Sequence, residues 1–400
     1  MKTAHFPSSH MMVIYTKSRN LKRKCRSEPN LRMLAINTLD EAASLRPYQV
    51  PAAEAKQYQK EVIKHFENVL TSSQRATAYF PGATPVSLMR DEIESLYTSP
   101  HLVSLKADGV RYMLLLTVTP SNEPVALFVN RSFEFFEVSV WCEESFFAQG
   151  SLFDGELVAD QGNTFTYLLF DCISVCGKSM VKTKYSERLT YVQALFDCIS
   201  DTKAEQNDAG EERSFEEFII QHNKIVAGSQ NPLTNISFRP KPFLQLDKGT
   251  ASSLWHKRGS FPFFSDGLIF TPSDSPVTAM RDVRCKKWKN THTIDITLIL
   301  GSHDTTVAIG SNAKQELQSS AVIPGFSEQE YTMHIIHNVI TDGLPKGRHV
   351  VECTVDIVTD THSLYFSPIK MRSDKPVANS IYTVGATLTN ILQAVDITEL

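Results

Sequence analysis

Hydrophobic and polar residues follow two different periods along this chain. In residues 40–75 apolar side chains recur every three or four positions among Ala, Glu and Lys, which predicts helical structure. From Leu102 to Val175 the pattern changes to short runs rich in β-branched and aromatic residues, with turn residues between them. Such runs predict a largely antiparallel sheet. A helix is then expected over Ser186–Ile199.

Strand-like segments resume in the second half of the chain, at 235–246, 266–271 and 283–300. The segment 291–370 is strand-rich with polar loops and is long enough for a small β-barrel. Residues 381–400 are expected to form one amphipathic helix. The pattern therefore predicts an α+β fold in which antiparallel sheets dominate.

The length points to more than one domain. A chain of 400 residues exceeds one ordinary core, because domains contain about 100–200 residues each. We expect a basic arm over 1–40, a first domain over 41–290 and a barrel domain over 291–380. The terminal helix over 381–400 would pack back on the first domain. Seven acids against two bases mark 201–217 as an exposed, acid-rich insertion.

Charge and composition exclude several classes of protein. Forty Lys and Arg against 44 Asp and Glu give a net charge of −4, far from the basic excess of a protein that coats nucleic acid. No apolar run approaches the ~18–20 residues needed to cross a bilayer, so no membrane partner is expected. The seven cysteines form no CxxC pair, so we expect reduced thiols in an intracellular protein rather than a zinc site.

A basic cluster at 17–26 bears on the compartment. Such a cluster is typical of a nuclear-localisation signal, and an acid-poor N-terminus is also typical of an organellar transit peptide. The same residues could equally form a solvated arm without any signal. We expect the nucleus, with an organellar, viral or cytoplasmic setting as the alternatives.

Four Asp-Gly pairs stand out, at 108–109, 154–155, 266–267 and 342–343. Taken singly, each is typical of a turn between the two strands of a hairpin. The first pair follows Lys106 at the end of a predicted strand, where glycine lets the backbone turn sharply and approach a ligand. A lysine at such a corner can act as a nucleophile if burial or neighbouring cations suppress its positive charge.

Lys287-Trp288-Lys289 supplies such cations. In a strand the two lysines share one face, whereas Trp288 points into the core on the other. Two ammonium groups on one face repel each other and contribute little as structure. Around a phosphate group they are favourable, and they would also weaken the hold of a third lysine on its proton.

An ordered set of motifs surrounds these residues. Lys106-Ala107-Asp108-Gly109-Val110-Arg111 resembles the Lys-x-Asp-Gly-x-Arg motif of the nucleotidyl-lysine superfamily, which holds mRNA capping guanylyltransferases and ATP-dependent polynucleotide ligases. Further motifs follow in the order of the family: Phe153-Asp154-Gly155-Glu156-Leu157-Val158, Tyr167-Leu168-Leu169-Phe170-Asp171, Ser265-Asp266-Gly267-Leu268-Ile269-Phe270 and Cys285-Lys286-Lys287-Trp288-Lys289. Four features are similar to capping enzymes rather than ligases: Phe80-Pro81-Gly82-Ala83-Thr84-Pro85-Val86-Ser87, the Trp inside Lys-Trp-Lys, Val351-Glu352-Cys353 and Met371-Arg372-Ser373-Asp374-Lys375.

The resemblance implies a fold and a two-step reaction. The fold is an antiparallel-sheet nucleotidyltransferase domain of the ATP-grasp and DNA-ligase type, followed by an OB-fold β-barrel that closes over the site as a lid. In the reaction Lys106 attacks the α-phosphate of GTP and releases pyrophosphate, which leaves a covalent lysyl-GMP. The 5′-diphosphate end of an RNA then takes the GMP and becomes a GpppN cap. Phosphoryl transfer of this kind depends mostly on positioning and charge neutralisation.

Residues that match the family's motifs take their roles from it, one position at a time. Arg111 and Glu156 would hold the ribose. Arg131 would contact phosphate or ribose, although Asn130 stands where the family has Asp.

Three residues are expected around the guanine base. Phe170 would stack on one face and Ile269 would pack on the other. Lys241 is the candidate for reading O6, a hydrogen-bond acceptor that adenine lacks.

The resemblance also assigns the phosphates and a metal ion. Mg²⁺ or Mn²⁺ would bind Asp266 and Glu156, since such cations suit carboxylate and phosphate oxygens. Lys287 and Lys289 would neutralise the α-phosphate. The second domain would orient the β- and γ-phosphates through Asp295, Arg372, Asp374 and Lys375.

The partners expected are GTP, a 5′-diphosphate RNA end and other proteins. The sequence has no HCxxxxxR phosphatase loop and no Gly-x-Gly for S-adenosylmethionine, so a separate RNA triphosphatase and cap methyltransferase are expected. In a nucleus the resemblance implies docking on the phosphorylated tail of RNA polymerase II. Two other functions stay open: an ATP-dependent polynucleotide ligase of the same superfamily, and a catalytically inactive scaffold in a capping or transcription complex.

Overall fold

The computed structural model describes residues 49–76, 80–138, 140, 142–159, 165–199, 236–301, 305–308, 320–342, 344–372 and 377–400. The chain forms two compact units. The first comprises residues 1–86, 93–288 and 400, and the second comprises residues 87–92 and 289–399.

The first unit contains a seven-stranded sheet in the order β5-β4-β3-β6-β7-β8, with β9 paired to β7 outside this path. Its strands are β3 (Val110–Val118), β4 (Pro124–Val129), β5 (Phe135–Val138), β6 (Ser151–Ala159), β7 (Phe165–Val175), β8 (Lys178–Ser179) and β9 (Ile236–Pro240). Neighbours pair antiparallel, except that β9 runs parallel to β7. The predicted α+β fold with antiparallel sheets is confirmed.

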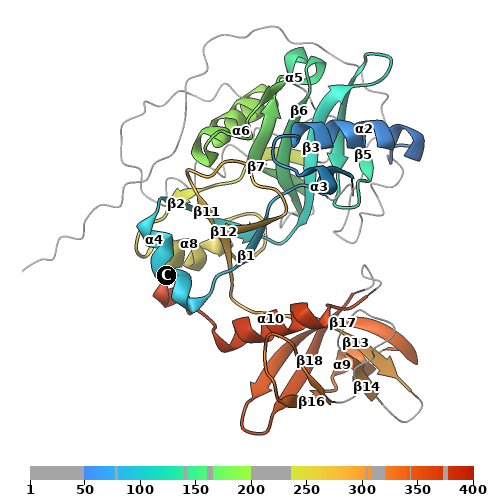
Figure 1. The fold of residues 1–400 in the computed structure, drawn as a ribbon, viewed down its shortest axis with the longest axis vertical. Helices are drawn as coiled ribbons and strands as arrows, with labels where there is room; N and C mark the ends of the chain where they lie inside the picture. Colours follow the sequence, from blue (N-terminus) through green and yellow to red (C-terminus); the bar gives the residue numbers. More distant parts are fainter. Residues whose placement is uncertain are drawn as a thin grey trace, which may run out of the picture. The chain divides into compact units, whose positions relative to one another are not determined.

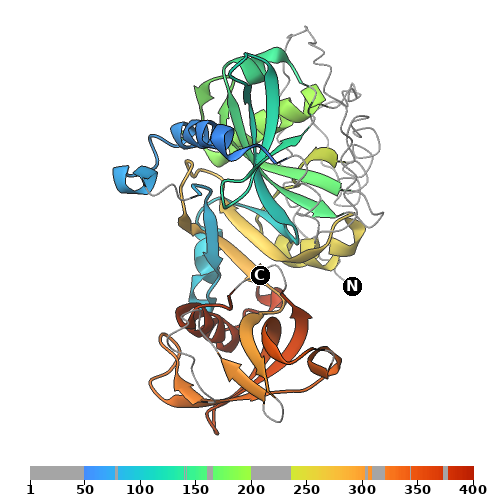
Figure 2. The same ribbon diagram turned by 90° about the vertical axis from the view of Figure 1, so that its right-hand side faces the viewer.

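Helices cover both faces of this sheet, which explains why β3 carries an uninterrupted apolar run at its centre. Leu114 and Leu116 of β3 lie in a core shared with α5 (Glu144–Ala148) and α6 (Tyr185–Ile199). Met113 and Leu115, one residue out of phase, lie in a second core shared with α2 (Ala52–His65). A sheet with one solvated face would instead carry polar residues at every second position. Figure 1 shows α2 on one side of the sheet and α6 on the other, and Figure 2 shows α2 crossing the strands.

The second sheet of this unit has five strands in the order β1-β12-β11-β2-β10. They are β1 (Thr84–Ser87), β2 (His101–Ala107), β10 (Leu244–Gln245), β11 (Ser265–Pro272) and β12 (Arg281–Lys289). Helix α8 (Thr250–His256) buries Leu254 and Trp255. The Trp255 ring meets that of Trp288 in β12 edge-on, with 5.0 Å between the ring centroids. This contact fixes one face of β12 to the core.

The Asp-Gly pairs are not hairpin turns where the structure describes them in full. Asp108-Gly109 joins β2 to β3 and carries the chain from one sheet to the other. Gly155 lies inside β6, where a Cβ would overlap the ring of Tyr167, so only glycine fits. Gly267 lies inside β11, directly after an irregularity in the strand pairing. The hairpin interpretation is therefore wrong for these three pairs.

The second unit contains a six-stranded sheet in the order β14-β13-β17-β18-β16-β15. Its strands are β13 (Ile294–Leu300), β14 (Thr305–Ala308), β15 (Ser320–Val322), β16 (Glu330–Ile335), β17 (Gly347–Val358) and β18 (Ser363–Met371). β16 and β18 pair parallel, and the other pairs are antiparallel. Contacts between β14 and β16 curl the sheet toward closure, which is consistent with the OB-type domain that we predicted.

The C-terminal helix α10 (Ile381–Leu392) is shorter than predicted and packs differently. Val384 and Leu388 lie in the core of the second unit, whereas we expected this helix to pack on the first domain. The helix ends at Leu392, and Asp396 then starts a separate turn, in which its carboxylate accepts a hydrogen bond from the backbone N–H of Thr398 at 2.8 Å.

The other predicted elements are found with small differences. The helix predicted at 186–199 is confirmed as α6, and the helical pattern of 40–75 gives α2 and α3 (Ser72–Ala76). The other helices in the described part of the chain are α4 (Ile93–Thr98), α9 (Val339–Asp342) and the 3₁₀ turns Arg90–Glu92, Arg258–Ser260 and Ile397–Glu399. The arm at 1–40 and the insertion at 201–217 lie outside the described residues. Within the described part of the chain, no helix is long and apolar enough to cross a membrane.

His65 at the end of α2 is expected to make the fold sensitive to acid. Its Nδ1 lies 2.7 Å from the Ser174 hydroxyl, and burial lowers its pKa from 6.5 to about 4. Between these two values the unfolded chain binds a proton that the folded protein does not, so stability is lost as the pH falls. The free energy of unfolding should drop by ~2–3 kcal/mol across this window, at about 1.4 kcal/mol per pKa unit. Urea denaturation of His65→Gln should give a flatter dependence on pH, and an unchanged dependence would contradict this assignment.

Candidate active site

Lys106 and Asp266 meet where two strands of the five-stranded sheet lie side by side. Lys106 is near the end of β2, and its Nζ donates a hydrogen bond to Oδ1 of Asp266 at 2.6 Å. The two side chains are 23% and 33% exposed, so the pair is accessible to a ligand. A β-bulge lies at this contact: Ser265 pairs with Ala107 and Gly267 pairs with Lys106, which leaves Asp266 as the extra residue. Bulges redirect side chains in this way.

Lys287-Trp288-Lys289 lies at the end of β12, the neighbour of β11. Trp288 is 5% exposed and packs on Trp255, whereas the two lysines are half-buried on the opposite face. The alternation expected from the sequence is therefore present. Cys285 shares the face of the lysines, and burial raises the pKa of its thiol to about 12. This face of β12 thus carries two positive charges and a neutral thiol.

Glu156 of β6 and Lys241, in the loop between β9 and β10, lie within electrostatic reach of Lys106. Gly109 permits the close approach of β6, because a Cβ there would be 2.9 Å from Cγ of Glu156. Burial raises the pKa of Glu156, and the positive charges of Lys241 and Lys106 oppose this rise. Burial lowers the pKa of Lys241, the charge of Glu156 opposes this, and the charge of Lys106 lowers it further. Two lysines and a carboxylate thus influence one another electrostatically.

Phe170 is presented by a second bulge, this time in the seven-stranded sheet. In the pairing of β6 with β7, Asp154 is opposite Asp171 and Gly155 is opposite Leu169. Phe170 is therefore the residue without a partner on β6, and its ring is only half-buried. An aromatic side chain that is half-exposed inside a core strand is available to a ligand.

Two cations flank the Phe170 ring. The Nζ of Lys241 and the guanidinium carbon of Arg111 lie 5.5 and 5.6 Å from the ring centroid, within cation–π distance. Arg111 is held by two hydrogen bonds to the buried carboxylate of Asp154, at 3.0 and 2.5 Å, and lies 5.6 Å from the Phe80 ring. The sequence analysis missed Asp154, although the residue belongs to one of the conspicuous Asp-Gly pairs. Its carboxylate orients Arg111 beside the ring.

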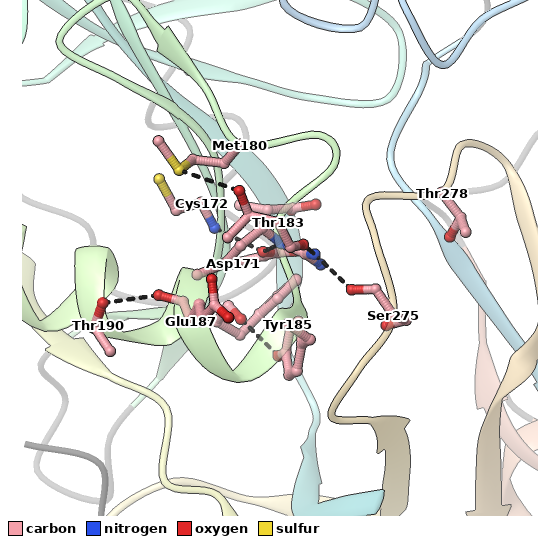
Figure 3. A network of polar contacts seen from close by, with 12 residues as sticks. Asp171, Cys172, Met180, Thr183, Tyr185, Glu187, Thr190, Ser275 and Thr278 are labelled. Carbon is pink, nitrogen blue, oxygen red and sulfur yellow. Dashed lines mark hydrogen bonds and ion pairs between the residues drawn. The ribbon is translucent and has the colours of Figure 1, made fainter. Parts of the chain in front are cut away.

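Helix α6 holds the backbone of Phe170 in place. Tyr185 donates its hydroxyl hydrogen to the Phe170 carbonyl at 2.6 Å. Arg188 donates to both carboxylate oxygens of Asp171, at 2.6 and 3.0 Å, and to the carbonyl of Ser275 at 2.8 Å. Figure 3 shows Asp171, Tyr185 and Ser275 of this network. Because Ser275 follows β11, the largely buried Arg188 ties one sheet to the other. The helical pattern predicted α6 but not which of its polar residues face the sheet.

The structure also locates the other nucleotide contacts predicted for the first unit. Ile269 is half-buried in β11. It comes two residues after Gly267, which pairs with Lys106, so the side chains of Ile269 and Lys106 point to the same face. Arg131 is exposed in the turn between β4 and β5, where desolvation and the charge of Arg111 lower its pKa. Asn130 orders this turn, since its side-chain oxygen accepts two backbone hydrogen bonds at 2.9 Å each.

In the second unit Arg372 contacts two carboxylates. Its Nη1 lies 3.2 Å from Asp295 and 3.5 Å from Glu352, which face each other on β13 and β17. Asp374 and Lys375 lie outside the described residues. Of the four phosphate contacts predicted for this unit, the structure brings Asp295 and Arg372 together. Glu352 belongs to a motif noted in the sequence but was not assigned a role.

The donor groups of the site suit a divalent cation that binds together with phosphate. Among the residues that the structure describes, there is no cluster of three or more His, Cys, Asp or Glu that could hold a metal ion alone. Asp266 and Glu156 nevertheless interact electrostatically, since the charge of Asp266 raises the pKa of Glu156. Mg²⁺ is usually bound by one or two carboxylates, with water and substrate phosphates as the other ligands. Two carboxylates beside Lys106 match that requirement.

Comparison with known proteins decides the family. A sequence model described as "mRNA capping enzyme, catalytic domain" matches residues 42–291, which is more than half of the chain. The chain belongs to this family. The match includes Lys106, Glu156, Lys241, Asp266 and Lys287, the residues gathered in the first unit.

Several curated capping enzymes are similar to this chain. The mRNA-capping enzyme subunit alpha of Saccharomyces cerevisiae is 28% identical over 257 residues, which cover 58% of this chain and 50% of the relative. The protein of the same description from Neurospora crassa is 24% identical over 375 residues, 84% of this chain and 86% of the relative. The chain thus spans about half the length of the first relative and most of the second. A solved structure of a mycobacterial DNA ligase D with ATP and MES is 14% identical, at a TM-score of 0.38, over 74% of this chain and 94% of that one.

The ion pair between Asp171 and Arg188 should stabilise this capping-enzyme domain. Arg188→Met leaves a largely buried carboxylate without its partner, which should cost about 3–5 kcal/mol of stability. The double variant Asp171→Asn/Arg188→Met should be less destabilised than the sum of the two single changes, because no unpaired charge remains. Urea denaturation of the four proteins measures this coupling. Strictly additive losses would show that the pair contributes nothing as a pair.

Proposed function

We propose that this protein is an mRNA guanylyltransferase. It transfers GMP from GTP, through a covalent lysyl-GMP on Lys106, to the 5′-diphosphate end of an RNA. The observation that carries the proposal is the 2.6 Å contact between Lys106 and Asp266, which lies at a β-bulge. The charges of both residues also act on the nearby Lys241. Membership of the capping-enzyme family supports the same reaction.

In the first step Lys106 is the nucleophile. Asp266 holds Nζ by a hydrogen bond and sets its direction. The ammonium group first loses a proton. The neutral amine then attacks the α-phosphorus of GTP, so that a P–N bond forms, the P–O bond to pyrophosphate breaks and the excess proton on nitrogen is released. Lys287 and Lys289 provide positive charge for the phosphate oxygens from the neighbouring part of the sheet.

Guanine is recognised by groups that the fold holds rigidly. The Phe170 ring offers a stacking surface, and Ile269 packs on the other face of the base. Lys241 is buried, and its backbone N–H donates to the Leu169 carbonyl at 2.7 Å, so its position beside the ring is fixed. An ammonium group there donates to O6 of guanine, whereas adenine would present an amino group to it.

The other charged groups bind the sugar, the phosphates and a metal ion. Asp266 and Glu156 would hold Mg²⁺ or Mn²⁺, which would supply positive charge for the phosphate oxygens. Arg111 and Arg131 contact the ribose or a phosphate. The β- and γ-phosphates are assigned to residues of the second unit: Asp295, Arg372, Asp374 and Lys375.

In the second step an oxygen of the RNA β-phosphate attacks the phosphorus of the lysyl-GMP. The P–N bond breaks and Nζ regains a proton.

The reaction needs an RNA triphosphatase to prepare the diphosphate end and a cap methyltransferase to complete the cap. We propose that both are separate chains, that the enzyme works in the nucleus, and that it docks on the phosphorylated tail of RNA polymerase II.

Labelling with GTP or ATP distinguishes this function from its two rivals. The protein is incubated with α-³²P GTP or ATP and Mg²⁺ or Mn²⁺ and then run on a denaturing gel. We expect label from GTP alone, stable to alkali, labile to acid and removed by pyrophosphate. Label from ATP instead would indicate a polynucleotide ligase, and no label from a folded protein would indicate a scaffold.

Lys106→Ala should abolish the labelled adduct without unfolding the protein, because the side chain is part-exposed and contributes little to packing. Lys60→Ala, which removes an exposed lysine from α2, is the matched control and should label normally. Circular dichroism of both variants checks the fold. Adduct formation by Lys106→Ala at the normal rate would remove this residue from the mechanism.

Lys241→Met should weaken the selection of guanine. Loss of a charged hydrogen bond to O6 should lower the efficiency of adduct formation with GTP by about 10- to 100-fold, as expected for such a bond. A 2-aminopurine riboside triphosphate, which lacks O6, should show the same loss with the unaltered protein. Lys241→Met should form the adduct equally well with GTP and with the 2-aminopurine analogue. If Lys241→Met instead lost further efficiency when GTP was replaced by the analogue, Lys241 would not contact O6.

A further inference from the structure

Phe264 is an exposed aromatic residue close to Lys106. It comes directly before β11 and is 63% exposed, whereas Phe261 and Phe263 are both buried. Its carbonyl accepts a hydrogen bond from the backbone N–H of Asp108 at 2.9 Å. The backbone of Phe264 is therefore fixed against the corner that follows Lys106. A single exposed apolar residue requires no explanation, but this one has a defined position in the site.

The register of β2 and β11 places the Phe264 side chain on the face that carries Lys106. Ala107 pairs with Ser265, and this pair points to the buried side, since Ala107 is buried and the Ser265 hydroxyl oxygen is inaccessible to solvent. Asp108 and Phe264 lie just beyond the ends of β2 and β11 and are joined by a backbone hydrogen bond that continues the pairing by one step. Phe264, which is exposed next to the buried Phe263, therefore points to the opposite side from Ala107 and Ser265. Lys106 and Phe264 are two residue steps apart along the ladder, roughly 7 Å at ~3.3 Å per step.

Ile269, Lys106 and Phe264 follow one another along this face of the sheet. Gly267 is the residue of β11 opposite Lys106. Ile269 comes after Gly267 along the chain and Phe264 comes before it, so the two side chains lie on opposite sides of Lys106. In the proposed function Ile269 packs on guanine and Lys106 holds the α-phosphate. Phe264 then lies on the side away from guanine. The RNA β-phosphate reaches the α-phosphorus opposite the P–N bond. The side away from guanine, where Phe264 lies, is the one that the GMP leaves open for the first nucleotide of the RNA.

We propose that Phe264 is a stacking platform for the 5′-terminal base of the acceptor RNA, an inference that rests on the proposed function. Unpaired RNA bases stack on exposed aromatic side chains, and every base has a face that can do so. The transfer step itself is unchanged: a β-phosphate oxygen of the RNA forms the new bond to phosphorus, the P–N bond breaks and Lys106 takes up a proton. Phe264 holds the RNA end while this exchange takes place.

The two half-reactions test the platform separately from the enzyme's first step. Lysyl-GMP is formed with labelled GTP, isolated, and then discharged either by a 5′-diphosphate oligoribonucleotide or by pyrophosphate. Phe264→Ala should form the adduct and return it to pyrophosphate at the rates of the unaltered protein, because neither reaction involves an RNA base. Its transfer to subsaturating oligoribonucleotide should be slower by about 5- to 150-fold, the range for loss of one stacked base.

Two matched controls separate stacking from general apolar contact. Phe264→Trp should retain transfer, whereas Phe264→Leu, which is apolar without a π face, should lose it. An oligoribonucleotide with an abasic 5′-terminal residue should be used equally by Phe264→Ala and the unaltered protein. Equal transfer of GMP to the complete oligoribonucleotide, or a parallel loss of adduct formation, would overturn the platform. A folded, unaltered protein that forms no adduct at all would instead refute the guanylyltransferase function, and the platform with it.

Discussion

The contact between Lys106 and Asp266 is the interaction on which the rest of the site depends. A nucleophile must point in one direction, and a half-buried ammonium group needs a carboxylate partner that also leaves it accessible. Asp266 is the one extra residue that β11 has between Ser265 and Gly267. If the pairing that includes Gly267 and Lys106 continued without this bulge, Asp266 would be opposite Ala107 and would point to the buried face, away from Lys106. The extra residue instead turns its carboxylate to the face of Lys106 and gives the proposed nucleophile a fixed direction.

The seven-stranded sheet uses the same device. A bulge in β7 turns Phe170 out of the regular pattern, and the buried pair of Arg111 and Asp154 fixes a cation beside its ring. Arg188 then ties this sheet to the loop after β11 through the Ser275 carbonyl. The doubly covered sheet thus supports the proposed base-binding surface, and the five-stranded sheet supports the lysines. Each sheet contributes one of the proposed site residues at the point where its pairing is irregular.

Much of this could be predicted from the sequence, and the exceptions have a common cause. The strand alternation of Lys287-Trp288-Lys289 and the helix over 186–199 follow from periodicity, which is a local property. Bulges depend on the pairing of two strands that are distant in sequence, so no local pattern predicts them. The Asp-Gly pairs, taken singly, suggest hairpin turns for the same reason: Gly155 is glycine because Tyr167 passes over it, not because the chain turns there. Asp154 and Arg188 were missed because their partners come from other elements.

The central claim is that one lysine, at the bulge of β11, carries the nucleotide. Peptide mapping by mass spectrometry of the protein after reaction with GTP tests it most directly, because it identifies the modified residue rather than the presence of an adduct. The account predicts GMP on the peptide that contains Lys106 and on no other. GMP attached to Lys241 or Lys287 would contradict it, since the lysine held by Asp266 would then not be the nucleophile.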